Sequence, residues 1–218
     1  VGSVGDDSWG KAYRKDLGEA GVELILASSP APTGFFISLV RPDGGRTVLV
    51  APGAALDLSL EGPPPGIFRK DGILYLEGFL LHDRSFFVSC IEAARASGMQ
   101  IAVDLGSFSL VEAQRDFILE ILTDYCDWLF ANEDEFCALT GLPLAEGLDL
   151  LADSGPALIV KLSERGAIYA RGDLRLESPV RALYPVDETG AGDAFAAGFL
   201  SAASLGLPPE RCLRLGNR

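Results

Sequence analysis

Four short apolar runs, with helical patterns between them, restrict the fold of this chain more than any other feature of its sequence. Each run is bounded by turn or helix signals, and they lie at Ile73–Leu76, Ile101–Val103, Trp128–Phe130 and Ala157–Val160. Strands this short and this apolar are typical of a parallel sheet that is covered on both faces. Their alternation with helices therefore predicts an α/β fold with right-handed crossovers.

The segments between the runs have the spacing of amphipathic helices. Arg84–Ser97 and Val111–Thr123 each place their apolar residues on one side of a helix. A further helix is predicted near the N-terminus, ending at about Ala20, with Asp7 or Ser8 as its cap. After the last apolar run, residues 167–170 and 174–177 flank an Arg-Gly-Asp turn and predict a β-hairpin.

Residues 22–50 have a different pattern. Three strand-like runs are present, at Val22–Leu26, Phe35–Val40 and Thr47–Val50. The sequence RPDGG at 41–45 predicts a hairpin turn, and EGPPPG at 61–66 predicts a stiff connector. We therefore expect a β lid and connector over residues 22–67, attached to an α/β body that is formed by residues 1–21 and 68–218.

The composition argues against several classes of protein. With 18 Lys and Arg against 31 Asp and Glu, the formal net charge is −13, which argues against non-specific binding of nucleic acid or anionic membranes. No run approaches the roughly 18 apolar residues of a membrane-spanning helix. The four Cys form no CxxC pair and the only His is His82. We therefore expect no Cys/His zinc site, but thiols in a reducing compartment, as in a cytoplasmic protein.

The segment Asp187–Phe199, DETGAGDAFAAGF, carries the clearest chemical signal. Gly190, Ala191 and Gly192 allow backbone N–H groups to converge at the N-terminus of a helix that is apolar on most sides and should be buried. Asp193 stands beside this anion hole, where a carboxylate could accept the proton of a substrate hydroxyl that attacks a phosphoryl group. The alternative is that Asp193 caps the helix and the glycines form a tight turn.

Two weaker signals follow the predicted strands. Asn132 and Glu135 lie three residues apart, so on a helix they share one face and could hold hydrated Mg²⁺ or order phosphates. The same pair could instead form an N-terminal capping box. Ser163 and Gly166 could meet a nucleotide at the carboxyl end of a parallel strand, or form a solvated turn.

These segments resemble the ribokinase-like (PfkB) family of carbohydrate and nucleoside kinases. DETGAGDAFAAGF is similar to the C-terminal signature of that family, and residues 132–135 are similar to its N-x-x-E motif. Residues 161–166 are similar to its L-G-x-x-G turn, with Ser163 where glycine is usual, and residues 1–10 to its G-x-x-G-x-D-x-x-G segment. Residues 32–47, 74–81 and 129–136 resemble the adenosine-kinase-like branch.

The resemblance implies a three-layer α/β sandwich with a mostly parallel central sheet and a small β-sheet lid. It implies ATP- and Mg²⁺-dependent transfer of the γ-phosphoryl group to a hydroxymethyl group of a sugar or nucleoside. Asp193 would be the catalytic base, and Gly190, Ala191 and Gly192 the anion hole.

The roles of the remaining site residues are implied by the resemblance alone. Asn132 and Glu135 would orient Mg²⁺ and phosphate, with Glu135 acting through water or phosphate. Ser163 and Gly166 would contact ATP, and Glu77 would face the substrate. Two further residues fall where several family members bind a monovalent cation such as K⁺, namely Asp187 and Thr189.

The resemblance also shows a departure. Family members begin earlier, with lid strands and a Gly-Gly…Asn helix that hold the substrate, and they continue past Asn217 into helices that close the adenine pocket. The chain therefore resembles an internal piece of a kinase. The alternative function is a non-catalytic nucleotide- or metabolite-binding protein, or an inactive fragment. A dinucleotide oxidoreductase fits less well, since Gly2, Gly5 and Glu23 match its fingerprint only loosely. The lid sheet could pair with a second copy to give a homodimer.

Overall fold

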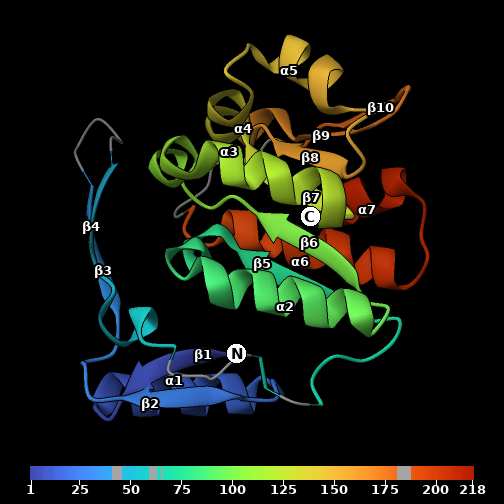
Figure 1. Ribbon diagram of the computed structural model, residues 1–218. Coiled ribbons are helices and arrows are strands. Elements are labelled where there is room, and N and C mark those ends of the chain that lie inside the picture. The colour runs from blue at the N-terminus through green and yellow to red at the C-terminus, as the bar shows by residue number, and fades with distance from the viewer. Residues whose placement is uncertain (41–45, 59–62, 65, 181–187) are drawn as a thin grey trace. The chain divides into compact units, whose positions relative to one another are not determined.

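The computed structural model describes residues 1–40, 46–58, 63–64, 66–180 and 188–218 (Figure 1). It contains two compact units, Val1–Pro64 and Pro65–Arg218, which are described one at a time. The assignment of residues 1–21 to the α/β body remains a prediction. The expected hairpin turn at 41–45 lies outside the described residues, as do residues 61, 62 and 65 of the expected connector.

The larger unit is built on a six-stranded sheet. Its strands are β5 (Ile73–Glu77), β6 (Gln100–Asp104), β7 (Trp128–Asn132), β8 (Ala157–Lys161), β9 (Ala167–Arg171) and β10 (Leu174–Ser178). In space their order is β10-β9-β8-β7-β6-β5. The strands from β5 to β8 are parallel, and β9 and β10 add the expected antiparallel hairpin at one edge. The prediction of a mostly parallel sheet is therefore confirmed.

Helices cover both faces of this sheet (Figure 1). In this view α2 (Arg84–Ala96) and α3 (Phe108–Tyr125) lie in front of the strands, and α6 (Ala191–Ser204) lies behind them. The unit also contains the α-helices α4 (Glu133–Thr140), α5 (Leu144–Leu151) and α7 (Pro209–Gly216) and the short 3-10 helices η2 (Gly78–His82) and η3 (Ser163–Arg165). In the described part of the chain no helix combines the length and apolar character needed to cross a membrane. The three-layer α/β arrangement is confirmed.

The sheet face toward α6 carries an aromatic core. Phe130 of β7 packs edge-on against Phe195 and Phe199 of α6, with ring centroids 6.5 and 5.4 Å away. The expectation that this helix is buried on most sides is wrong: its aromatic face is buried, whereas Ala194 and Ala197 are exposed. Because side chains alternate between the two faces of a sheet, Asn132, two positions beyond Phe130 at the carboxyl end of the strand, also lies on the α6 side.

The smaller unit contains two strand pairs. β1 (Gly2–Gly5) pairs in parallel with β2 (Leu26–Ser29), and β3 (Phe35–Val40) pairs with the antiparallel β4 (Arg46–Ala51). The unit also holds α1 (Ser8–Glu19) and the 3-10 helix η1 (Gly53–Leu56). The prediction of a strand at Val22–Leu26 is wrong, because pairing with β1 begins only at Leu26 and continues through two serines. This pairing depends on a distant segment of the chain, so an apolar run is not required for it.

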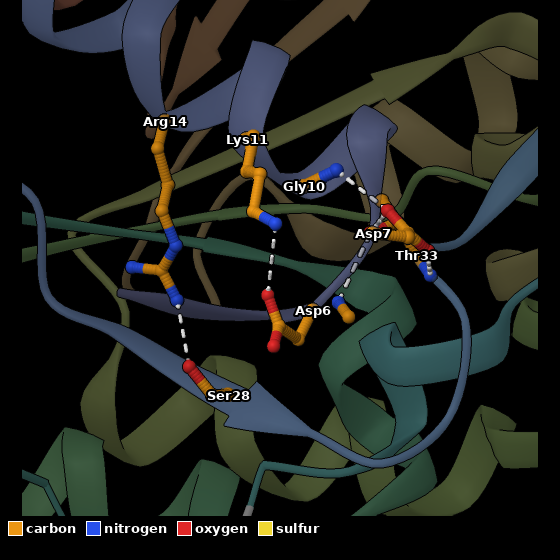
Figure 2. Close-up of polar contacts among 8 residues, drawn as sticks. Asp6, Asp7, Gly10, Lys11, Arg14, Ser28 and Thr33 are labelled. Carbon is orange, nitrogen blue, oxygen red and sulfur yellow. Dashed lines mark hydrogen bonds and ion pairs between the residues drawn. The ribbon is translucent and has the colours of Figure 1, made fainter.

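Asp7 ties the start of α1 to the loop after β2 (Figure 2). Its Oδ1 accepts hydrogen bonds from the Gly10 amide at 2.8 Å and from the Thr33 hydroxyl at 2.8 Å, and its Oδ2 accepts from the Thr33 amide at 2.7 Å. The Thr33 hydroxyl in turn accepts from the Gly5 amide at 3.0 Å. These bonds, led by that from Gly10, lower the pKa of Asp7 to about 2. Asp7, rather than Ser8, is therefore the cap of this helix.

Candidate active site

The carboxyl ends of the parallel strands meet at one edge of the larger sheet and end in polar residues. Each strand extends one or two residues beyond its apolar run, so that the last residues are Glu77, Asp104, Asn132 and Lys161. Glu77 is in register with Asp104, and Asn132 with Lys161. In open α/β sheets, ligands bind outside this edge, so the four residues define the candidate site.

A buried ion pair lies in this site. The Lys161 ammonium donates to Oδ2 of Asp104 at 2.6 Å, and the Tyr75 hydroxyl donates to the same oxygen at 3.2 Å. The Asp104 side chain is 4% exposed and that of Lys161 is 17% exposed. Oδ1 of Asp104 is buried and has no hydrogen-bond partner among the described residues. Burial, and then the charges of Asp104 and Glu77, raise the pKa of Tyr75, so its hydroxyl remains a donor.

Glu77, the predicted substrate-facing residue, lies next to this ion pair. Burial raises its pKa above the ordinary value, and the neighbouring carboxylates of Asp104 and Asp193 raise it further. A hydrogen bond with Tyr75 and the charge of Lys161 act in the opposite direction. The next residue, Gly78, is needed for the strand to turn here, because a Cβ on it would overlap the carbonyl oxygen of Leu105. Its role toward a substrate remains a prediction.

The N-terminus of α6 carries the three residues predicted to form an anion hole, Gly190, Ala191 and Gly192; their contact with an anion remains a prediction. Gly190 is the N-cap residue and has left-handed backbone, with φ 76°. The Ala191 amide donates to the carbonyl of Glu188 at 3.1 Å. The amides of Gly192 and Asp193 belong to the first turn, whose N–H groups have no partner within a helix. These two amides are therefore the ones in this turn that could bind an anion, whereas the amide of Ala191, a predicted member of the hole, is already engaged with Glu188.

Asp193 is the third residue of α6, and its side chain is exposed. The alternative in which it caps the helix is wrong, because Gly190 occupies the cap position without any side-chain hydrogen bond. One residue earlier, a Cβ added to Gly192 would lie 3.3 Å from Nζ of Lys161. The absence of a side chain at Gly192 thus lets an ammonium group approach the start of the helix that carries Asp193.

Asn132 and Glu135 form a capping box at the start of α4. The Glu135 amide donates to Oδ1 of Asn132, and the Asn132 amide donates to Oε2 of Glu135, both at 2.8 Å. Glu135 is buried, which raises its pKa, while the hydrogen bond from Asn132 and the charge of Lys161 lower it. The capping alternative is therefore confirmed, and it leaves the second carboxylate oxygen for a role toward Mg²⁺ or phosphate, which remains a prediction.

The residues predicted to bind a monovalent cation are described only in part. Thr189 lies in the turn before α6, and Asp187 is outside the described residues. Within the described residues, no cluster of three or more His, Cys, Asp or Glu side chains could hold a metal ion.

Ser163 and Gly166 lie in the tight turn that follows β8. Ser163 has left-handed backbone, with φ 53°, at the position where the resembling family has glycine. Gly166 has φ 94° and ψ −131°, and a Cβ there would overlap the carbonyl oxygen of Ser178. The turn is therefore a tightly constrained backbone feature, and its contact with ATP remains a prediction.

Three residues of the site were not among the predicted site residues. Tyr75, Asp104 and Lys161 were assigned to strands or to strand ends, although the structure joins them by hydrogen bonds. A signal for two of them was present, since Asp104 and Lys161 are the first polar residues after two apolar runs, as Glu77 is after a third. Polar residues at equivalent strand ends lie at the same edge of a parallel sheet.

Comparison with known proteins identifies the family. The pattern of the pfkB family carbohydrate kinases matches residues 1–218. The chain belongs to this family. Among curated relatives, ribokinase from Arabidopsis thaliana is 28% identical over 98% of the chain. The cytidine kinase of Thermococcus kodakarensis is 31% identical over 99% of the chain.

Solved structures of PfkB kinases agree with the fold. The adenosine kinase from Sinorhizobium meliloti matches 100% of this chain with a TM-score of 0.87 and 31% identity. The chain spans 59% of the length of the Arabidopsis ribokinase and 69% of the Sinorhizobium structure. The PfkB fold and family are therefore established for this chain, whereas the reaction of the whole protein is a matter for proposal.

Proposed function

We propose that the complete protein is an ATP-dependent kinase that phosphorylates a hydroxymethyl group of a sugar or nucleoside. Membership of the PfkB family supports this proposal, because its members are carbohydrate and nucleoside kinases. The observation that carries it is the exposed carboxylate of Asp193, which directly follows Gly192 at the N-terminus of α6. That arrangement places a proton acceptor next to amides that can bind a phosphoryl group.

In the proposed reaction Asp193 accepts the proton of the acceptor hydroxyl as its oxygen attacks the γ-phosphoryl group. The first-turn amides of α6, at Gly192 and Asp193, stabilise the negative charge on the transferred group. Kinases of this family use ATP with a divalent metal ion, and bound Mg²⁺ neutralises phosphate charge. The protein contributes orientation and charge, which account for most of the catalysis in phosphoryl transfer.

The remaining predicted residues fit supporting roles. Asn132 and Glu135 would order the metal through water or phosphate, using the carboxylate oxygen that the capping box leaves free. Ser163 and Gly166 would lie along the nucleotide. Glu77 would face the acceptor, where its carboxyl group would form a hydrogen bond with a substrate hydroxyl.

The names of the relatives favour an acceptor that carries ribose. They include a ribokinase, an aminoimidazole riboside kinase, a cytidine kinase and an adenosine kinase. All four names denote ribose or a compound that contains it, whereas one further relative is a fructokinase from Oryza sativa subsp. japonica. We therefore place ribose and ribonucleosides ahead of fructose as the acceptor class.

The test is ATP consumption by the complete protein with a panel of ribose, fructose, cytidine and adenosine. Acceptor-dependent formation of ADP supports the proposal, and the preferred acceptor identifies the substrate class. Asp193→Asn is the matched variant, because it keeps the shape of the side chain and removes its proton affinity. A general base contributes about 10²- to 10⁴-fold, so kcat should fall by that range while ATP affinity changes little. Unchanged kcat would remove Asp193 from the reaction.

The alternative function, a non-catalytic nucleotide- or metabolite-binding protein, gives a different result in the same experiment. Such a protein would bind ATP in calorimetry and form no ADP with any acceptor. Asp193→Asn would then alter neither measurement.

Three further features of the protein are proposals. A monovalent cation such as K⁺ would bind near Asp187 and Thr189, and a titration of activity with K⁺ against choline tests this. A homodimer would form through the β3–β4 ribbon. The cysteines Cys90, Cys126, Cys137 and Cys212 are free thiols, which is consistent with a reducing compartment such as the cytoplasm.

A further inference from the structure

Lys161 carries a positive charge in a site that also holds several carboxylates. Four acidic side chains belong to the site, namely Glu77, Asp104, Glu135 and Asp193. The charge of Lys161 acts on two of them, since it lowers the pKa of both Glu77 and Glu135. The negative charge of a triphosphate that enters this site must be balanced by positive charge, because the triphosphate and the carboxylates repel each other strongly at close range in a partly buried environment.

The ammonium of Lys161 has hydrogen-bonding capacity left. A lysine ammonium has three donors, and among the described residues its hydrogen-bond partner is Oδ2 of Asp104. The side chain is 17% exposed, so the group is partly accessible from the site. It also lies beside the start of α6, since a Cβ on Gly192 would be 3.3 Å from Nζ.

The ion pair with Asp104 is poorly arranged for stability alone. Both Tyr75 and Lys161 donate to Oδ2 of Asp104, while Oδ1 is buried without a partner among the described residues. An unpaired buried carboxylate oxygen is costly, and a buried ion pair stabilises a fold only when its remaining lone pairs are satisfied. Holding the ammonium at this point is the more direct explanation for the pair.

We propose that Lys161 is a catalytic cation of this kinase, which binds the oxygens of the transferred phosphoryl group beside the Gly192 amide. Asp104 is its positioning residue, because its Oδ2 accepts a hydrogen bond from the ammonium at 2.6 Å. This inference rests on the proposed phosphoryl transfer and adds a side chain to an anion hole that the sequence predicted to be made of backbone amides. No covalent bond to Lys161 is involved.

The decisive experiment compares Lys161→Met with the double variant Lys161→Met/Asp104→Asn in the complete protein. Lys161→Met removes the cation and leaves the Asp104 carboxylate buried and unpaired, so it lowers the melting temperature. The double variant removes both charges and regains the melting temperature.

If Lys161 acts on the phosphoryl group, both variants lose about 10²- to 10³-fold in kcat, the range for loss of one charge-stabilising donor. The KM of the acceptor stays within about threefold of the wild type. Recovery of kcat in the double variant would overturn the proposal and leave Lys161 as the counter-ion of Asp104.

A matched control is available in the same sheet. Arg95 pairs with Asp127 at 3.4 Å, and the pair is partly buried at the opposite, amino end of the strands. Arg95→Met breaks an ion pair of the same kind at a site without phosphate chemistry. It should lower stability and leave kcat unchanged.

Binding of Mg²⁺-AMP-PNP by calorimetry separates this inference from the proposed function. Weaker binding to Lys161→Met than to the wild type, by about tenfold or more, supports the inference even where the wild type turns over no acceptor of the panel. Turnover by the wild type, with kcat in both Lys161 variants equal to that of the wild type, overturns the inference alone. A wild-type protein that neither binds the nucleotide nor turns over overturns both.

Discussion

Asn132 and Glu135 each accept a hydrogen bond from the backbone amide of the other, at 2.8 Å in both directions. The reciprocal pair fixes the start of α4 directly after β7 and holds one carboxylate oxygen of Glu135 in place. The structural role of Glu135 can therefore be separated by experiment from a role toward Mg²⁺, since only the second requires its charge.

Glu135→Gln should not lower the melting temperature and should raise the Mg²⁺ concentration needed for half-maximal activity. Glutamine serves in a capping box as glutamate does, whereas the negative charge that attracts the metal is lost. Thermal unfolding and a Mg²⁺ titration of ATP turnover measure the two effects. A lower melting temperature with an unaltered Mg²⁺ requirement would assign Glu135 to capping alone.

The same variant should change how stability depends on pH. Burial raises the pKa of Glu135 above its ordinary value of 4.5, so the folded state holds this proton more tightly than the unfolded state. The favourable contribution is complete below pH 4.5 and is lost as the pH rises through the folded pKa. Glu135→Gln cannot lose a proton, so its stability relative to the wild type should increase as the pH rises above about 4.5. Denaturant unfolding between pH 4 and 8 would show this, and parallel curves would contradict it.

Asp7 should give the opposite dependence on pH. Its hydrogen bonds lower its pKa from 3.8 to about 2, so its contribution to stability is present above pH 3.8 and is lost as the pH falls through about 2. Asp7→Asn keeps a good helix cap and removes the titration. We expect the wild type to lose its advantage over Asp7→Asn between about pH 4 and pH 2, as measured by circular dichroism. The control is Asp6→Asn: Asp6 is highly exposed and 3.4 Å from Lys11, so this change should have little effect.

Two substitutions in the turn after β8 should have opposite effects. Ser163→Gly should stabilise the protein by about 0.5–1 kcal/mol, because left-handed backbone costs an L-residue roughly 1–2 kcal/mol and the greater freedom of unfolded glycine offsets part of that gain. Gly166→Ala should destabilise it, since the added Cβ overlaps the Ser178 carbonyl. Urea unfolding measures both changes. A destabilised Ser163→Gly variant would mean that the serine side chain makes a stabilising contact of its own.

The β3–β4 ribbon should promote self-association. Its apolar side chains are largely exposed on both strands, and Ile37 lies opposite Leu49, with exposed fractions of 49% and 54%. Exposed apolar ribbons with free edges tend to pair with other chains. We expect Ile37→Lys to reduce the average mass in sedimentation at micromolar concentration. An unchanged mass distribution would place any self-association elsewhere.

The strands of the central sheet could be predicted from the sequence, but the contacts between the polar residues at their carboxyl ends could not. Ile73–Leu76 and the other apolar runs were recognised because a strand buried on both faces leaves a continuous hydrophobic signal. Pairing continues past these runs to Glu77, Asp104 and Lys161, since backbone hydrogen bonds do not depend on the side chain. The ion pair between residues 57 positions apart follows from strand order, which the apolar pattern does not specify.

The glycine at which α6 begins could be predicted for a different reason. Its small residues are a local signal, and Gly190 indeed has the left-handed backbone that glycine favours. Strand β2 shows the reverse case. Leu26–Ser29 has little apolar character and depends on its partner β1, so a local pattern placed the strand too early, at Val22.

The edge-on packing of Phe130 against Phe195 and Phe199 has a consequence for mutational screening. These rings hold α6 on the sheet, and the same helix carries Asp193 in its first turn. A displacement of about 1 Å can reduce a rate by about 10²-fold. Replacing Phe195 or Phe199 by a smaller side chain that lets the helix shift would therefore abolish turnover in a protein that still folds. A mutational scan that ranks positions by loss of activity would then rank Phe199 with Asp193, and a buried apolar side chain would be mistaken for a catalytic residue.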